Sequence, residues 1–138
     1  MQRILVGIDG SMTSQAAARQ AVELATAVGA EMHFVTVVRS DDATVLKVAG
    51  DEWEISNLQS AEANIGRFVA SLNATVSYTV SAIEGAPAKA LISEAERLEV
   101  DLIVVGNVRM QGIGRVLGSV GNTIAHNAPC NVLIVKTV

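Results

Sequence analysis

The chain has 138 residues, of which half are hydrophobic and only 3% aromatic, and its formal net charge is −4. This length suits one domain with a core of aliphatic side chains, a mixture typical of buried parallel strands covered by alanine-rich helices. The acidic balance, the lack of a basic run and the lack of any apolar stretch near the roughly 20 residues of a membrane helix argue against nucleic-acid and membrane partners.

The first half of the chain alternates apolar strands with a helix. The continuous apolar run Ile4–Ile8 predicts a central strand, and Met32–Val38 predicts a second one. Between them, apolar residues at helical spacing predict a helix over 13–28, which Gly29 ends. Residues 39–56 are the least regular stretch. We expect a loop there, either a solvated surface loop or, with its Trp53, a lid over a binding site.

The second half continues the alternation. A period of two from Thr75 to Ala82, with one polar face, predicts a half-exposed strand at a sheet edge. Pro87 suits the first position of a helix. The other expected elements are helices over 57–72, 87–99 and 119–127, strands over 102–105 and 132–135, and a loop over 106–118.

Strands that alternate with helices imply right-handed crossovers and a parallel sheet. We therefore predict a three-layer α/β/α fold, in which an open five-stranded parallel sheet carries helices on both faces and residues 1–138 form one domain. In such sheets ligands bind beyond the carboxyl ends of the strands, where the strand order reverses. The residues at these ends are Asp9-Gly10-Ser11, Val37-Val38, Gly85-Ala86 and Gly106-Asn107.

The loop after the fourth strand is rich in glycine and opens a helix. It has four glycines between Gly106 and Gly118. Glycine lets backbone N–H groups approach an anion, and a helix start adds free N–H groups and a partial positive charge. The pattern predicts a phosphate site, and the alternative is that the glycines only shape a tight connection. The side chains available to a phosphate are those of Arg109, Arg115 and Ser119.

With these residues in view, the whole chain resembles the universal stress protein family. The resemblance implies a parallel sheet in the order 3-2-1-4-5, a homodimer and, in one subgroup, ATP bound through a loop written G-x2-G-x9-G-[ST]. It rests on Ile4-Leu5-Val6-Gly7-Ile8-Asp9-Gly10-Ser11, Val104-Val105-Gly106, Gly118-Ser119-Val120 and Ala128-Pro129-Cys130-Asn131-Val132-Leu133-Ile134-Val135, in this order.

The resemblance also implies which residues contact the nucleotide. Ile8 and Asp9 match the strand end beneath it, Val37 matches a valine near the adenine, and Gly106 matches the first glycine of the loop. Asp9 would contact a ribose hydroxyl or a Mg²⁺ ion held by the phosphates; the alternative is that it caps its turn. The expected nucleotide-binding residues are Ile8, Asp9, Gly10, Val37, Val105, Gly106, Asn107, Arg109, Gly112, Gly118, Ser119 and Val120.

The loop departs from the family pattern at one point. Arg109 stands where the pattern has its second glycine, and eight residues instead of nine separate it from Gly118. Either Gly112 and Gly114 restore the flexibility of the missing glycine, or Arg109 puts a side-chain charge where a backbone amide usually sits. ATP, AMP and cyclic AMP are therefore all candidate ligands.

Several other polar residues have structural interpretations beside functional ones. Ser11 or Thr13 either donates to a ligand or caps the first helix. We expect His33 to be packed or at an interface, His126 to interact with a helix dipole, and Cys130 to be a small buried hydrophobe. Two histidines this far apart form no recognisable metal motif.

The sequence predicts a binding protein and not an enzyme. It has no P-loop, nucleophile elbow or dinucleotide fingerprint, and no paired acid and base, so slow ATP hydrolysis is the lowest alternative. The lone Cys130 and a strand that starts too early for a signal peptide indicate the cytoplasm.

We expect a protein partner, not identified by the sequence, to recognise the nucleotide-bound form. The fifth strand, Asn131–Val135, is an apolar edge that we expect to pair across the two-fold axis of a homodimer. The alternative function is a dimeric interaction protein of the same fold without a functional nucleotide site.

Overall fold

A computed structural model describes residues 1–39, 51–106 and 119–136, and the side chains of 51–57 and 119 lie outside that description. Five parallel strands form one sheet in the order β3-β2-β1-β4-β5, which confirms the predicted fold class and strand order. The strands are β1 (Arg3–Gly7), β2 (Glu31–Val38), β3 (Tyr78–Glu84), β4 (Leu102–Gly106) and β5 (Asn131–Val135).

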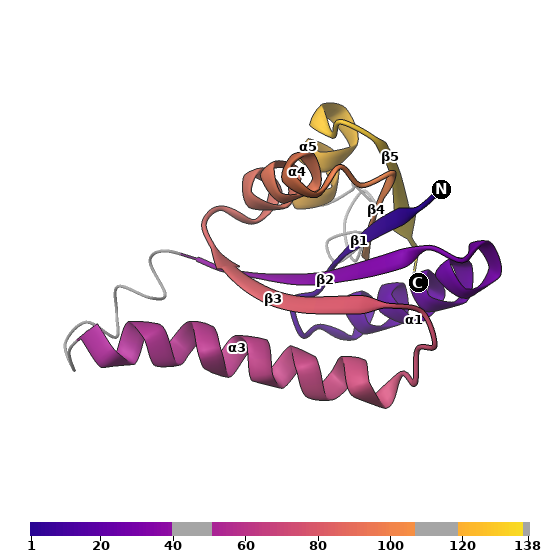
Figure 1. Cartoon of the computed structure of the whole chain (residues 1–138). Helices are drawn as coiled ribbons and strands as arrows, with labels where there is room; N and C mark the ends of the chain where they lie inside the picture. The colour runs from indigo at the N-terminus through magenta and orange to yellow at the C-terminus, as the bar shows by residue number, and fades with distance from the viewer. Residues whose placement is uncertain (40–50, 107–118, 137–138) are drawn as a thin grey trace.

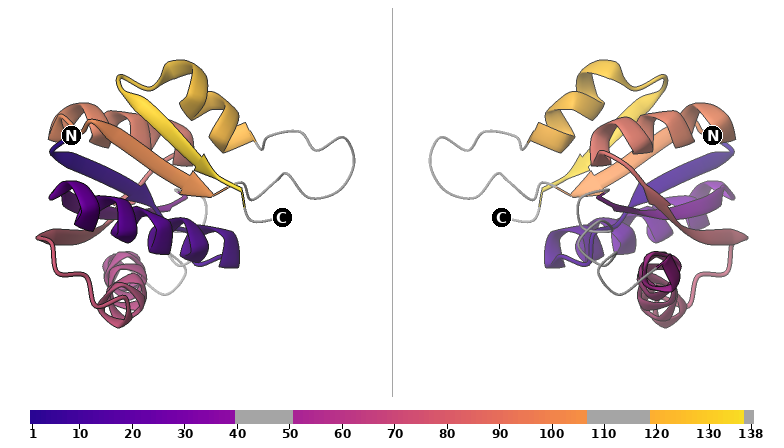
Figure 2. Two further views of the ribbon diagram at one scale, coloured as in Figure 1. Left: turned by 90° about the vertical axis from the view of Figure 1, so that its right-hand side faces the viewer. Right: turned by 90° about the vertical axis from the view of Figure 1, so that its left-hand side faces the viewer.

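Helices cover both faces of the sheet. One layer holds α1 (Met12–Val28) and α3 (Asp51–Ser71), and the other holds α4 (Pro87–Leu98) and α5 (Ser119–Asn127). The two side views show the same three layers, with the sheet between the helix pairs (Figure 1 and Figure 2). This arrangement follows from right-handed crossovers that run in opposite directions on the two sides of β1.

The core beneath α1 and α3 is built from small helix residues and large strand residues. The alanine stripe of α1 is fully buried and lets the helix lie close to the sheet. Phe34 is the largest buried side chain of this layer, and its ring meets that of Tyr78 edge to face at 5.8 Å. The other buried members are Ile4, Val6, Ile8, Met32, Ile65, Val69, Leu102, Val104 and Val135.

A second core lies beneath α4 and α5. Leu91 and Ala95 of α4 and Ile124 of α5 pack against alternate residues of the strands. The buried strand residues on this side are Leu5, Val35, Ile103 and Val105. Both faces of the central strands are therefore buried, as the continuous apolar runs of the sequence predict.

Single residues with suitable side chains or backbone preferences mark the ends of α1 and the start of α4. Ser11 is the N-cap of α1, and its hydroxyl accepts a hydrogen bond from the Ser14 N–H at 3.2 Å. Gly29 ends α1 in the left-handed conformation at φ +73°, as predicted. Pro87 occupies the first turn of α4.

Two predicted boundaries were wrong. Helix α3 begins at Asp51, so the expected loop over 39–56 does not extend over 51–56, and Trp53 is on a helix. Acidic residues such as Asp51 and Glu52 favour a helix start, a signal that the sequence prediction missed. Strand β3 begins at Tyr78 and not at Thr75. Tyr78 pairs with Met32, so Thr75 and Val76 would lie opposite residues that precede the start of β2 at Glu31.

Within the described ranges, no helix combines the length and the apolar character that crossing a membrane requires.

Candidate functional site

The site predicted from the sequence lies where the strand order reverses. β1 pairs with β2 on one side and with β4 on the other, and the helices that follow β1 and β4, α1 and α5, lie on opposite faces of the sheet. The gap between two such segments is the usual ligand position in open α/β sheets. At this point Gly106, the last residue of β4, lies against Thr13 in the first turn of α1, which directly follows the turn Asp9–Ser11.

Asp9 organises the turn between β1 and α1. Its Oδ1 accepts hydrogen bonds from the Ser11 N–H at 2.9 Å and from the Ser11 hydroxyl at 2.5 Å. The Ser14 hydroxyl faces the Asp9 N–H at 3.3 Å. No hydrogen bond to Oδ2 is present among the described residues, so one carboxylate oxygen shapes the turn and the other is available to a ligand.

The Asp9 carboxyl is ionised at neutral pH. Partial burial against the first turn of α1 raises its pKa, but the hydrogen bonds from Ser11 and Ser14 outweigh this effect, and the pKa lies below its ordinary value. A fixed carboxylate repels a bare phosphate and accepts hydrogen bonds from hydroxyl groups. It suits a ribose hydroxyl, or a cation that carries a phosphate.

Two glycines of the predicted site are required for different reasons. Gly10 has φ +85°, a left-handed conformation that allows the tight turn, and a Cβ there would meet no other atom. At Gly106 a Cβ would lie 2.7 Å from the Thr13 carbonyl oxygen and 2.8 Å from its carbon. Gly106 therefore lets the end of β4 contact the first turn of α1, which supports the packing interpretation of this glycine.

The apolar residues of the predicted site differ in what they can offer a ligand. Ile8 is 3% exposed and Val105 is 6% exposed, so their side chains belong to the two cores. Only their backbone groups can reach a ligand, and the Ile8 N–H is already bonded to the Val35 carbonyl at 2.9 Å. Val37 and Val120 are half-buried and present part of their surface at the carboxyl edge.

The structure places the predicted residues in two groups. Ile8, Asp9, Gly10, Val37, Val105 and Gly106 lie at the carboxyl ends of β1, β2 and β4. Ser119 and Val120 begin α5, as predicted, although the side chain of Ser119 is not described. Asn107, Arg109, Gly112 and Gly118 lie outside the described residues.

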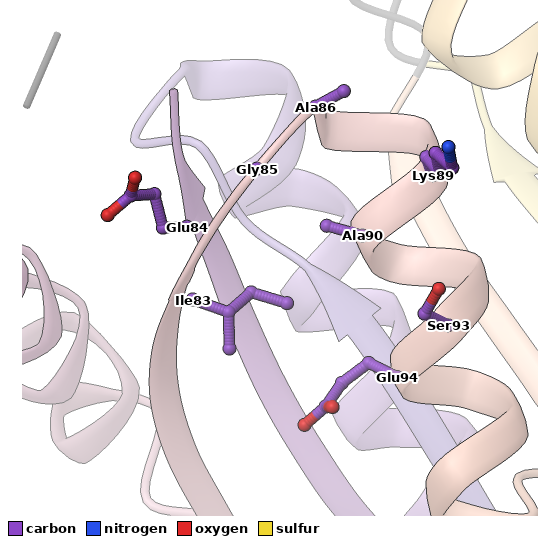
Figure 3. A pocket seen from close by; sticks show the side chains of 8 residues that line it. All are labelled: Ile83, Glu84, Gly85, Ala86, Lys89, Ala90, Ser93 and Glu94. Atoms are coloured by element: carbon purple, nitrogen blue, oxygen red, sulfur yellow. The ribbon is translucent and has the colours of Figure 1, made fainter. Parts of the chain in front are cut away.

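A groove of about 350 Å³ adjoins this edge between β3 and α4. It begins beside β2, because the Gly85 N–H donates to the Val38 carbonyl at 3.0 Å. In Figure 3, Ile83 extends from β3 toward α4, and Glu94 extends from α4 toward the strands. The sequence analysis identified Gly85 and Ala86 as strand-end residues but missed the polar ones. The lining residues are Ile83, Glu84, Gly85, Ala86, Lys89, Ala90, Ser93 and Glu94.

The remaining candidates lie apart from the carboxyl edge. His33 is packed inside, as expected, at 9% exposure. His126 is in the last turn of α5 and exposed. Cys130 is half-buried against the α4–α5 core, where burial, helped by the Asp101 charge, raises its pKa and keeps it a thiol. Within the described ranges, no three His, Cys, Asp or Glu side chains gather in a way that could hold a metal ion.

Comparison with known proteins gives consistent matches over nearly the full chain. Residues 1–136 match the model of the universal stress protein family. A universal stress protein of Methanocaldococcus jannaschii is 34% identical, covering 98% of this chain and 82% of the relative. The structure of UspA from Lactobacillus plantarum has a TM-score of 0.74 at 29% identity, with 97% of each chain covered. A universal stress protein in complex with cAMP has a TM-score of 0.73 at 33% identity, with 99% and 98% covered.

Proposed function

The chain belongs to the universal stress protein family, and from that premise we propose that it binds an adenine nucleotide at the carboxyl edge of its sheet. The observation that carries the proposal is the ionised Asp9 carboxylate at the reversal of strand order, where Gly106 at the end of β4 lies against the first turn of α1. The relative in complex with cAMP, 33% identical over nearly the whole chain, supports this ligand class.

In the proposed complex, Asp9 and Val37 hold the nucleoside. The Oδ2 of an ionised Asp9, which has no hydrogen bond within the described part of the chain, accepts hydrogen bonds from ribose hydroxyls. Val37 lies at the end of β2 with part of its surface exposed, which suits contact with the face of an adenine ring. The backbone around Ile8 and Gly10 lines the space between them.

The phosphates would lie at the start of α5. The first N–H groups of a helix have no partner within the helix, and its dipole favours negative charge there. Ser119 and Val120 begin α5 in the structure. The glycine-rich sequence from Gly106 to Gly118 and the charge of Arg109 fit the same role. These residues suit a phosphate group, and a Mg²⁺ ion would be held by the phosphates with Asp9 nearby.

The protein would act by binding and not by rapid catalysis. Of the predicted site residues that the structure describes, Asp9 is the one that titrates, and hydrogen bonds hold it ionised, which makes it a poor proton donor. A partner would recognise the nucleotide-bound form in the cytoplasm. Slow hydrolysis of ATP is a further candidate, and it would depend on water held by the phosphates and Mg²⁺.

We also propose a homodimer formed through β5. This strand is at the edge of the sheet, and its residues Val132, Leu133 and Ile134 are only partly buried in a single chain. Apolar edge strands favour pairing with another strand. Light scattering at micromolar concentration should give twice the mass of the chain, and Leu133→Lys should give the monomer. A monomeric wild-type protein would overturn this part of the proposal.

Calorimetry with ATP, AMP and cyclic AMP, each with and without Mg²⁺, tests the main proposal. We expect saturable binding of at least one nucleotide, and Gly118→Trp should abolish it because a large side chain would fill the phosphate position. Glu23→Gln, which removes an exposed carboxylate of α1, is the control and should bind like the wild type. An absence of heat and of thermal shift with all three nucleotides would refute the proposal. It would leave the dimeric interaction protein as the function.

A further inference from the structure

Ser14 is a buried serine in the first turn of α1, directly after the Asp9 turn, and the proposed site does not use it. It is 2% exposed, in a part of the chain where most polar side chains reach solvent. A buried hydroxyl group needs hydrogen-bond partners inside the protein, so the bonds that Ser14 makes indicate its role.

The Ser14 hydroxyl is bonded to both ends of the Asp9 turn. Its Oγ donates to the Ser11 carbonyl at 2.9 Å and accepts the Asp9 N–H at 3.3 Å. A hydroxyl has one proton, which the Ser11 bond uses, and its lone pairs remain for the Asp9 N–H. Both partners are backbone groups. The hydroxyl therefore fixes the main chain on either side of Gly10, and with it the direction in which the Asp9 side chain leaves the backbone.

The Asp9 carboxylate depends on this course of the main chain. Its Oδ1 accepts the Ser11 N–H at 2.9 Å and the Ser11 hydroxyl at 2.5 Å, and Oδ2 has no hydrogen bond among the described residues. The two bonds to Oδ1 form only while Asp9 and Ser11 stay close to each other. Ser14 bonds one backbone group of each of these residues, so it holds them at the distance that the carboxylate needs.

The backbone that carries the Ser14 hydroxyl is itself fixed by the end of β4. A Cβ on Gly106 would lie 2.7 Å from the Thr13 carbonyl oxygen and 3.2 Å from the Ser14 nitrogen, so β4 ends directly against this turn of α1. A packed backbone of this kind moves little, because a shift of the helix would force a shift of the strand. Ser14 therefore joins the Asp9 turn to a rigid support.

We propose that Ser14 is a positioning residue for nucleotide recognition. By bonding the backbone of Asp9 and Ser11, it holds the Asp9 carboxylate with Oδ1 on Ser11 and with Oδ2 left for a ribose hydroxyl. Ser14 does not contact the nucleotide and acts only through Asp9. The ligand part of this inference rests on the proposed function, whereas the placement of the Asp9 carboxylate by Ser14 does not.

The alternative is that Ser14 only stabilises the start of α1. Both roles predict that Ser14→Ala loses some stability, so stability alone does not separate them. They differ at the carboxylate. The Ser14 hydroxyl is one of the groups that lower the pKa of Asp9 against the effect of burial. A positioning role predicts that its removal changes this pKa, and that any loss of affinity requires the Asp9 carboxylate.

A carbon-detected NMR titration of the Asp9 carboxyl in the ligand-free protein tests the first part. In Ser14→Ala we expect the pKa of Asp9 to rise above its wild-type value, because hydrogen bonds that favour the charged form are lost or weakened. Alanine is smaller than serine and favours a helix, so the variant should keep the fold. The matched control is Thr26→Ala, which removes another α1 hydroxyl, bonded to the Val22 carbonyl at 2.7 Å. It should leave the pKa of Asp9 unchanged. An Asp9 pKa in Ser14→Ala equal to that of the wild type would overturn the proposal.

A double-mutant cycle measured by calorimetry tests the second part, with whichever of ATP, AMP and cyclic AMP binds the wild type. Ser14→Ala should weaken binding about tenfold in the wild-type background and about twofold or less in Asp9→Asn, because the charge that Ser14 positions is then absent. Equal losses in the two backgrounds would overturn the positioning role. If the wild type bound none of the three nucleotides, the proposed function would fail, and the NMR titration would still decide whether Ser14 places the Asp9 carboxylate.

Discussion

The two ends of the sheet are held together in opposite ways. At the amino end, side chains join segments that are distant in sequence. The Asp101 carboxylate accepts the Gln2 and Arg3 N–H groups at 2.7 and 3.0 Å, across 99 and 98 positions. Arg3 also contacts Glu31 and donates to the Leu98 carbonyl at 3.1 Å. These bonds fasten β1 to β2 and to the connection between α4 and β4.

At the carboxyl end, the hydrogen bonds of the Asp9 turn are local. They join Asp9, Gly10 and Ser11 to residues no more than five positions away. Such bonds can rearrange without separating the strands, because they lie within the turn and do not join one strand to another. The comparison suggests that stability is concentrated at the amino end and ligand binding at the carboxyl end.

We expect the largest effect from Gly106→Ala. A loss of stability in this variant would show that the carboxyl end of the sheet also contributes to the free energy of unfolding. The new Cβ would lie 2.7 Å from the backbone oxygen of Thr13, so α1 or β4 must shift. We expect a loss of about 1–3 kcal/mol in the free energy of unfolding, measured with urea. The matched control is Gly66→Ala in the interior of α3, where a Cβ meets nothing within 4 Å. It should instead stabilise by about 0.5–1 kcal/mol. An equal effect of the two substitutions would contradict the packing role of Gly106.

Asp9→Asn should lower nucleotide affinity and leave the stability of the fold almost unchanged. The amide keeps an oxygen that can accept from Ser11 but removes the charge that would hold a ribose. We expect nucleotide affinity to fall about tenfold, equivalent to roughly 1.4 kcal/mol, with little change in the urea midpoint. Asp101→Ala should give the reverse result, a lower urea midpoint with unchanged affinity, because it removes the acceptor of two long-range hydrogen bonds. A loss of affinity in Asp101→Ala would show that the two ends are coupled.

Ser11→Ala removes the N-cap of α1 and tests whether the hydrogen bonds of the Asp9 turn affect only their own neighbourhood. The Ser14 N–H loses its acceptor, and Asp9 loses its hydrogen bond from the Ser11 hydroxyl while it keeps the one from the Ser11 N–H. We expect a loss of about 1 kcal/mol in stability, typical of an N-cap. Hydrogen exchange should place the change in the first turn of α1. If amides of β2 or β5 lost protection as well, the turn would not be a local unit.

The smallest expected effect is on acid stability. The pKa of Asp9 is lowered by its hydrogen bonds despite burial, and that of Asp101 by the N–H groups of Gln2 and Arg3, both from an ordinary 3.8. A carboxyl whose pKa is lower in the folded state stabilises above its unfolded pKa, and this contribution is lost as the pH falls through the folded pKa. Below about pH 4, Asp101→Asn should therefore lose less stability than the wild type in urea titrations. If the stability of Asp101→Asn changed with pH as that of the wild type does, Asp101 would not be one of the residues that stabilise the amino end.

Much of the fold could be predicted because its signals are local. Gly29 and Pro87 mark helix ends through their own backbone preferences, and the structure has them in those roles. The apolar runs of β1 and β4 predicted strands buried on both faces. The start of β3 could not be predicted from its alternating pattern, because the register with β2 decides where pairing begins.

The candidate site was predicted less completely. The sequence led to Asp9 and Gly106 but gave Gly106 a role toward phosphate, and only the contact with Thr13 revealed its packing role. Ser11 had two interpretations, and the hydrogen bond to Ser14 shows that it is the N-cap. Lys89, Ser93 and Glu94 of the groove carry no motif, so no pattern could have assigned them.

The class of fold, the strand order (through family resemblance) and the helix ends marked by Gly29 and Pro87 could be read from the sequence, because residue types and their spacing carry these signals. Three contacts follow only from the way the elements pack: Asp101 accepts the N–H groups at the start of β1, Gly106 contacts α1, and His33 is buried beside Thr79. These contacts join residues far apart along the chain. Their geometry depends on how strands and helices pack, which no local pattern of residues encodes.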